Sequence, residues 1–327
     1  MRKLVRMITA AAVFAALLGA AGAQDRYPSR SIKFVVPFVA GSATDTLARL
    51  LGNSVSKSLG QTVIVENISG GSGIPAAQAV VRSAPDGYTI FITSNTTHAS
   101  NQSMLKRVPY DAVADFEPIT KLGTITLALV AHPSVPANTI QELIAYAKAN
   151  PGKLSYGHAG VGSIQHLTGE LLKSLAETPD IVQVPYRGTG PAIADLVSGQ
   201  VPMGIVGVTG AMLEFHRTGK TRIVAITNPT RLAVAPELAT AAEQGLPGLT
   251  VTGTIGLLAP AGTPGSIAER IALATRAAVA EPTYQQVLSD AGIEATPDST
   301  PDKFRRSLAA DIALWTPVVK ALGLKLD

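Results

Sequence analysis

Four stretches of this chain combine small residues with hydroxyl groups in a way that suits anion binding. They are residues 38–45, 93–98, 156–166 and 184–191, and each follows a short strand-like run. The start of a helix has unpaired backbone N–H groups and the positive end of the helix dipole, and small residues let a ligand approach that backbone closely. Stretches of this kind predict a site for a carboxylate or a phosphate.

The first two stretches differ in how a ligand could use them. In 38–45 the hydroxyl groups of Ser42 and Thr44 could donate to an anion, or could cap the next helix while Asp45 complements its dipole. In 93–98 six consecutive side chains can form hydrogen bonds, although any loop needs polar groups. The candidate ligand-binding residues here are Phe38, Ala40, Gly41, Ser42, Thr44, Asp45, Ser94, Asn95, Thr96 and His98.

The third stretch is a glycine-rich loop between a strand and a helix. It lacks the G-x-G-x-x-G spacing and a following acidic residue, and no Gly-Lys-Ser/Thr follows it, so a small oxyanion suits it better than a nucleotide. In the fourth stretch Arg187 could pair with a carboxylate through two hydrogen bonds, or could be a merely exposed or structural arginine. The candidates in these two stretches are Gly160, Gly162, Ser163, His166, Tyr186 and Arg187.

Enzymatic chemistry has less support in the sequence. The chain has no cysteine, which excludes thiol catalysis and cysteine-ligated zinc or iron–sulfur clusters. The five histidines are dispersed, and neither an H-E-x-x-H motif nor a G-x-S-x-G nucleophile elbow occurs. A Ser-His-Asp triad stays open because its members need not be neighbours in sequence. We expect no catalytic residue, metal or cofactor, with an exported hydrolase as an alternative.

The first 23 residues predict a signal peptide. Three basic residues precede an apolar run over 8–18, and Ala21-Gly22-Ala23 fits a cleavage site before Gln24. The run is shorter than the roughly 20 residues that span a bilayer, and no second run of that length occurs. The expected location of the mature protein is the periplasm.

Charge and size exclude some partners. The chain has 27 basic and 23 acidic residues, and the leader holds three of the basic ones. The mature chain is therefore nearly neutral and has no basic stripe, so nucleic acid is not an expected partner. With 46% hydrophobic residues, a chain of this length can bury a core without disulfides. We expect a monomer.

Strands and helices alternate along the mature chain. Expected strands cover 32–38, 63–67, 88–92, 126–131, 154–156, 182–184, 203–208, 222–227 and 254–258; expected helices cover 44–59, 75–82, 140–150, 164–175, 191–198, 266–280, 283–291 and 301–322. This alternation predicts parallel α/β layers. The order repeats in mid-chain and returns late, so we expect two lobes facing across a cleft, lobe one from 26–125 plus 250–327 and lobe two from 126–249.

Short blocks throughout the mature chain carry a family resemblance. They include 27–30, 41–45, 65–67, 85–89, 109–111, 151–157, 184–188 and 256–264. In this order they resemble the substrate-binding proteins of tripartite tricarboxylate transporters, the Bug family. The resemblance implies a two-lobed α/β fold like that of periplasmic binding proteins, which closes on its ligand and works with membrane transporter subunits. It also implies a carboxylate held by backbone groups and ordered water between 38–45 and 94–98, with 160–166, Tyr186 and Arg187 in the second lobe.

Two departures from the family pattern bear on the ligand. Relatives commonly have an acid and an asparagine near the end of the 203–208 strand, where this chain has Val206 and its apolar neighbours. The missing acid disfavours ligands with an amino group, so Val206 joins the candidate ligand contacts. Residues 39–42 read Val-Ala-Gly-Ser where Pro-Ala-Gly-Gly is frequent. We expect a mono- or dicarboxylate, an aromatic one included, for a transporter or alternatively for a membrane sensor.

Overall fold

The first lobe is built on a central parallel strand. The computed structural model describes residues 27–105, 107–321 and 323, so the predicted signal peptide lies outside the described residues. Strand β1 (Ile32–Val36) pairs in parallel with β2 (Val63–Asn67) and with β3 (Thr89–Ser94). Helices α2 (Ala43–Leu59) and α3 (Ile74–Val81) connect these strands, the latter after a short 3-10 turn, η2 (Gly71–Gly73). The predicted alternation is confirmed here.

Two long strands make the sheet mixed rather than parallel. Strand β9 (Thr252–Pro260) runs antiparallel to β3, and β4 (Phe116–Ala131) runs antiparallel to β9. The prediction of parallel layers is therefore wrong for these strands. The prediction of β4 covered only 126–131, because bulges after Pro118 and after Lys121 interrupt the alternating pattern in its first half.

The second lobe uses the other half of β4. From Leu127 onward, β4 pairs antiparallel with β7 (Met203–Gly207) and β8 (Arg222–Ile226). Beyond β7 lie β5 (Ser155–His158) and β6 (Val182–Pro185), both parallel to it. The helices of this part are α5 (Ile140–Ala149), α6 (Ile164–Ala176), α7 (Thr189–Val197) and α8 (Gly210–Arg217), of which α8 was not predicted. A 3-10 turn, η4 (Pro247–Leu249), precedes β9.

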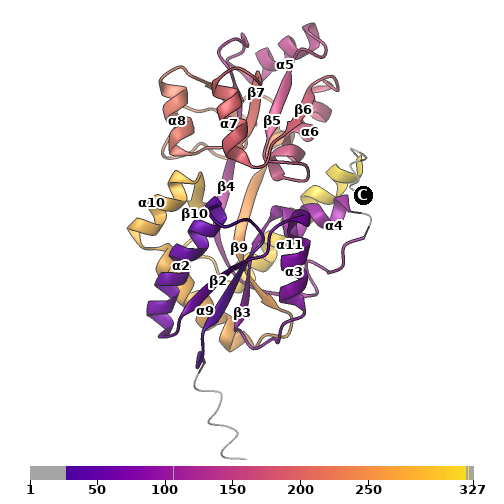
Figure 1. Ribbon diagram of the computed structural model, residues 1–327. Helices are drawn as coiled ribbons and strands as arrows, with labels where there is room; N and C mark the ends of the chain where they lie inside the picture. Colours follow the sequence, from indigo (N-terminus) through magenta and orange to yellow (C-terminus); the bar gives the residue numbers. More distant parts are fainter. Residues whose placement is uncertain (1–26, 106, 322, 324–327) are drawn as a thin grey trace, which may run out of the picture.

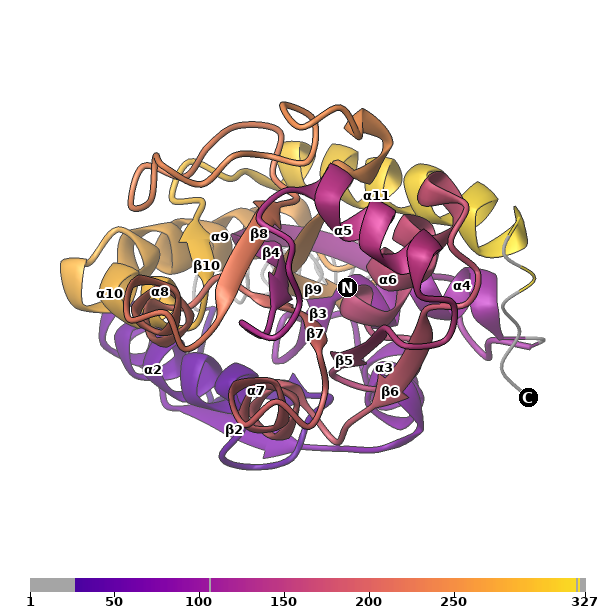
Figure 2. The same ribbon diagram turned by 90° about the horizontal axis from the view of Figure 1, so that it is seen from above.

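The C-terminal segments return to the first lobe. They comprise α9 (Gly265–Val279), α10 (Pro282–Asp290), the unpredicted β10 (Ile293–Ala295) and α11 (Pro301–Ala321). Figures 1 and 2 show α10 beside α2 and close to α8 of the second lobe. Helix α11 packs on β4 and leads Trp315 into the apolar core of the second lobe. Among the described residues, the helices lack the combination of length and apolar content that a membrane span requires.

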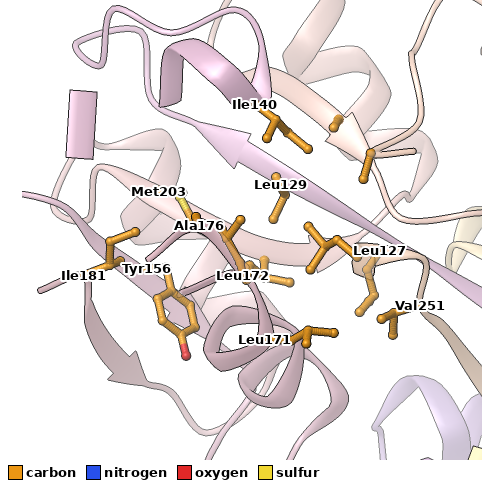
Figure 3. Close-up of a cluster of buried hydrophobic side chains, with 14 of the residues drawn as sticks. Leu127, Leu129, Ile140, Tyr156, Leu171, Leu172, Ala176, Ile181, Met203 and Val251 are labelled. Carbon is orange, nitrogen blue, oxygen red and sulfur yellow. The ribbon is translucent and has the colours of Figure 1, made fainter. Parts of the chain in front are cut away.

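Apolar side chains fill both lobes and continue between them. Figure 3 shows the second-lobe core, in which residues of β4, β5, α6 and β7 meet, among them Leu129, Tyr156 and Leu172. The same cluster includes Ala99 and Trp315 from segments that pack on the first lobe. The burial of these side chains stabilises the fold and ties the two lobes together on this side.

Candidate functional site

The strand directions bring the candidate loops of both lobes to one place. In the first lobe Ser94, the last residue of β3, pairs with Ile255 near the start of β9, which is where the lobes join. Strand β1 runs parallel to β3. In the second lobe Gly207 of β7 pairs with Leu127 at the same junction, and β5 and β6 run parallel to β7. The carboxyl ends of these strands therefore point toward the opposite lobe, which is where ligands bind in open α/β sheets.

Two tight turns, one in each lobe, share a backbone design. They span 39–42 after β1 and 160–163 after β5. In each turn the N–H of the fourth residue donates to the carbonyl of the first residue, with an N···O distance of 3.2 Å in the first turn and 3.1 Å in the second. The third residue of each is a glycine with positive φ, Gly41 at 81° and Gly162 at 82°. Other side chains are strained there, which explains the small residues in both loops.

A serine ends each turn and caps a helix. Ser42 has φ −68° and ψ 160°, and Ser163 has φ −67° and ψ 156°. Each Oγ accepts the N–H three residues later, from Asp45 and from His166, both at 3.2 Å. The capping role that the sequence left open is therefore confirmed. Because the oxygen accepts, the hydroxyl proton stays free to donate to a ligand.

The residue three positions after the serine bonds back to the glycine of the turn. The Gly41 N–H donates to Asp45 Oδ2 at 2.9 Å, and the Gly162 N–H donates to His166 Nδ1 at 3.3 Å. This reciprocal pattern is a variant of the capping box, in which the returning side chain accepts the N–H of the residue before the cap instead of that of the cap itself. Asp45 and His166 are both buried. Two of the predicted ligand contacts therefore hold the turns, and their side chains have little exposed surface for a ligand.

Both oxygens of the Asp45 carboxylate accept hydrogen bonds from the first lobe. The carboxylate also accepts from Arg49 Nε at 3.0 Å and from Asn67 Nδ2 at 2.9 Å. The hydrogen bond from Arg49, helped by those from Gly41 and Asn67, lowers the pKa of Asp45 to about 2. Asn67 additionally donates to the Phe38 carbonyl at 3.0 Å, so it fixes the loop on both sides.

The second turn is held by a pair of neutral histidines. The rings of His158 and His166 lie with centroids 4.8 Å apart. Gly160 donates its N–H to His158 Nδ1 at 3.2 Å, and His158 Nε2 lies 2.6 Å from Oε1 of Gln183. Burial lowers the pKa of both histidines, and for His166 the neighbouring His158 lowers it further, to about 4. His166 is therefore neutral near pH 7, as accepting a hydrogen bond requires.

The capped helices leave donors for an anion. The first N–H groups of a helix have no partner within it, and each serine satisfies only the third of them. In α2 this leaves the N–H of Thr44, and in α6 those of Ile164 and Gln165. The helices have 17 and 13 residues, so each dipole favours a negative charge at its start. In Figure 1, α2 begins at the end of the first lobe that faces the second.

The 93–98 stretch is not the loop that the sequence predicted. After β3 it forms a π-helix, η3 (Thr96–Ser100), that continues into α4 (Asn101–Met104). Ala99 is its one apolar residue, so no apolar period could indicate a helix. The Oδ1 of Asn95 accepts the Thr254 N–H in β9. Asn95 therefore bonds to the strand that joins the lobes and is turned away from the surface.

His98 also turns inward. It is 1% exposed, its Nδ1 lies 3.3 Å from Thr93 Oγ1, and its Nε2 lies 3.1 Å from Asp311 Oδ2 of α11. A hydroxyl, an imidazole and a carboxylate in a row form the chain of a catalytic triad. Thr93 is fully buried, however, so no substrate reaches its hydroxyl. We interpret this chain as a tie between η3 and α11, and among the described residues no group of acidic or histidine side chains could hold a metal.

Short distances group candidate segments within each lobe. A Cβ added to Gly73 of η2 would lie 3.0 Å from Pro37 and 2.6 Å from Thr97, so the loop after β1 and η3 both border this glycine. Ser94 and Thr96 remain partly exposed there. In the second lobe a Cβ on Gly160 would lie 3.3 Å from the carbonyl of Tyr186.

The remaining second-lobe candidates take different positions. Arg187 is exposed between β6 and α7, and it forms no ion pair within the described residues. The Tyr186 hydroxyl donates to Asp195 Oδ2 at 2.7 Å, and burial together with Asp195 raises the pKa of Tyr186 to about 12. Val206 is fully buried in an apolar cluster of the second lobe. The structure therefore gives the Val206 side chain a packing role, because apolar neighbours cover it and leave no surface for a ligand.

Four positioning residues were missed by the sequence analysis: Arg49, Asn67, Gln183 and Asp311. Arg49 and Asn67 bond to the candidate Asp45, and Asp311 bonds to the candidate His98. Gln183 bonds to His158, which was not a candidate but holds the second turn. Only Asn67 could have been recognised from the sequence, because it is the last residue of one of the family blocks and of a predicted strand.

These features coincide with a family whose members bind solutes. The model described as "Tripartite tricarboxylate transporter family receptor" matches residues 47–324. The chain belongs to this family. BugT of Bordetella pertussis is 34% identical to it over 327 residues, which cover 99% of each protein. The predicted membership of the Bug family of receptors is therefore confirmed.

Solved structures of similar receptors agree with the fold. The periplasmic binding protein BugD is 32% identical, with a TM-score of 0.78 over 91% of this chain and 99% of that one. MatC from Rhodopseudomonas palustris with bound malate is 33% identical, with a TM-score of 0.78 over 90% and 100%. R. palustris Rpa4515 with adipate is 33% identical, with a TM-score of 0.79 over 91% and 98%. The two-lobed α/β fold of periplasmic binding proteins is therefore confirmed, and the receptor family is not an enzyme class.

Proposed function

We propose that this protein is an extracytoplasmic receptor that captures a small mono- or dicarboxylate between its lobes and delivers it to the membrane subunits of a tripartite tricarboxylate-type transporter. It acts as a periplasmic monomer, exported by its N-terminal signal peptide. Family membership supports the receptor class, and the malate and adipate of two structural relatives support the carboxylate.

The pair of serine-capped turns is the observation that carries this proposal. Ser42 and Ser163 offer one hydroxyl donor each, beside the free N–H groups that start α2 and α6. An anion at such a site gains charge-assisted hydrogen bonds without a charged side chain opposite it. Asp45 and His166 do not repel the anion strongly, because the first is paired with Arg49 and the second is neutral.

Binding across the lobes explains how capture is signalled. A ligand that bonds to both turns stabilises the closed arrangement, since only that arrangement brings both sets of donors to it. Arg187 lies exposed beside the second turn and can reach a second carboxylate. The transporter then recognises the closed lobes.

A thermal-shift and calorimetry screen of the mature chain tests this function. A panel of mono-, di- and tricarboxylates, sugars and amines is compared; a ligand at 100 times its Kd adds about 2.7 kcal/mol to stability. We expect one carboxylate class to bind one-to-one without turnover. A protein that binds only sugars or amines would rule out the carboxylate site.

Two variants and a matched control locate the site. Ser42→Leu and Ser163→Leu remove a donor and add bulk at each turn, and we expect each to weaken binding at least tenfold. Thr139→Leu is the control, because Thr139 caps α5 in the same way, with Oγ1 accepting the Glu142 N–H at 3.1 Å. All three variants lose a cap worth about 1 kcal/mol of stability. Equal affinity in all three would place the ligand elsewhere.

A further inference from the structure

Each of the two capped turns carries one exposed valine. Val39 is 63% exposed and Val161 is 43% exposed. A single exposed apolar side chain is common on a protein surface and needs no explanation. Here one lies in each turn, on opposite lobes and within three residues of the capping serine, so a shared role is the better explanation.

The two segments that carry these valines have no charged side chain to bind a polar group on the ligand. Residues 38–44 and 159–165 contain no charged side chain. Asp45 and His166, which follow these two segments, are buried and already bonded to the turns. The donors therefore lie at the helix starts, and the exposed valines add an apolar surface to each turn.

This arrangement distinguishes ligands with a hydroxyl group from ligands with only methylene groups, because removing a hydroxyl from water costs free energy. A hydroxyl on a ligand loses its hydrogen bonds to water when the lobes close over it, and next to valine it gains no partner. A methylene in the same position gains from burial, by roughly fourfold in affinity. Two donor sets, one in each lobe, match a ligand with a carboxylate at each end.

Resting on the proposed function, we propose that Val39 and Val161 are specificity-determining residues that select dicarboxylates with an unsubstituted hydrocarbon spacer over hydroxylated ones. The two turns hold the carboxylates, and the valines contact the spacer when the lobes close. A hydroxyl on the spacer is rejected because the valine side chains next to it neither accept nor donate a hydrogen bond.

Paired ligands test this selection directly. Calorimetry on the mature chain compares succinate with malate, which differ by one hydroxyl, and adipate with galactarate, its tetrahydroxy analogue. We expect the unsubstituted member of the pair that fits the site to bind at least tenfold more tightly, within the roughly 100-fold by which an apolar pocket can reject an added hydroxyl. A tighter hydroxylated member would overturn the proposal.

Isosteric variants test whether the two valines cause the preference for unsubstituted dicarboxylates. Val39→Thr and Val161→Thr replace one methyl group by a hydroxyl of similar size, and each should narrow the affinity ratio at least threefold. Val113→Thr is the control, since Val113 is 60% exposed but precedes Phe116, which pairs with Pro260 at the far end of the sheet. Circular dichroism confirms that all variants are folded.

The outcomes separate this proposal from the proposed function. If no carboxylate binds the wild-type chain, the proposed function fails, and this proposal fails with it. If dicarboxylates bind but both threonine variants keep the wild-type ratio, only the role of the valines fails. If monocarboxylates alone bind, the receptor function stands and the dicarboxylate assignment is wrong.

Discussion

Asp45 and His166 occupy the same position in two copies of one capping motif. Each lies three residues after a capping serine, and each accepts the N–H of the glycine before that serine, at 2.9 Å and 3.3 Å. The acceptor is a charged carboxylate in the first lobe and a neutral imidazole in the second. The two lobes thus present similar turns to a ligand but respond to pH through different groups.

His166 should make stability depend on pH on the mildly acidic side. Its folded-state pKa is lowered from 6.5 to about 4, so between these values the unfolded chain binds the proton first and stability falls as pH falls. Below about pH 4 both states are protonated and the dependence ends. Urea unfolding from pH 7 to 4 measures it. His166→Asn keeps an acceptor that does not titrate and should flatten the curve; an unchanged slope would contradict the assignment.

Asp45 should contribute at lower pH. Its folded-state pKa of about 2 lies below the ordinary 3.8, so its contribution is present above pH 4 and is lost as pH falls toward 2. Asp45→Asn removes the charge from three hydrogen bonds and should cost about 1–2 kcal/mol at pH 7. Urea unfolding at pH 7 and pH 3 measures this loss, which should be smaller at pH 3.

An exposed ion pair provides the control for Asp45. Asp298 and Lys303 lie 2.6 Å apart with both side chains more than half exposed. Asp298→Asn should therefore cost about 0.5 kcal/mol or less. A loss as large as that of Asp45→Asn would mean that burial and the three hydrogen bonds do not distinguish Asp45.

The positive φ of Gly41 should make this position intolerant of alanine. No atom lies within 4 Å of an added Cβ, so the penalty is one of backbone conformation alone. We expect Gly41→Ala to cost about 1 kcal/mol, with Gly41→Asn costing less because asparagine tolerates this conformation. Gly190→Ala in α7 is the control, with equal space and no positive φ, and should be neutral or stabilising. Thermal melts give the order of the three variants.

The tie between His98 and Asp311 should support stability without catalysis. Asp311→Ala leaves the buried imidazole without its partner on α11, which should cost about 1–3 kcal/mol. Urea unfolding measures the loss, and an assay with activated esters tests the hydrolase alternative. Turnover that disappears in both Asp311→Ala and Thr93→Val would contradict a purely structural role.

Much of the fold could be predicted because its information is local. Leu47, Leu51 and Val55 recur at helical spacing, and the predicted helix 44–59 is found as α2 (Ala43–Leu59). The failures are also local in origin: bulges disturb the alternation in the first half of β4, and η3 has no apolar period. The expected boundaries between the lobes remain a prediction.

The sequence by itself determined most of the elements, the family and the two small-residue turns, since periodicity, glycine and capping serines act between near neighbours. Only the tertiary structure decided which polar side chains meet. His98 bonds to Asp311, 213 residues away, and Asp45 of α2 bonds to Asn67 at the end of β2. It also decided that Asn95 bonds to β9 and that Val206 packs in the core. Such pairings depend on the path of the whole chain and on burial, which no short stretch of sequence contains.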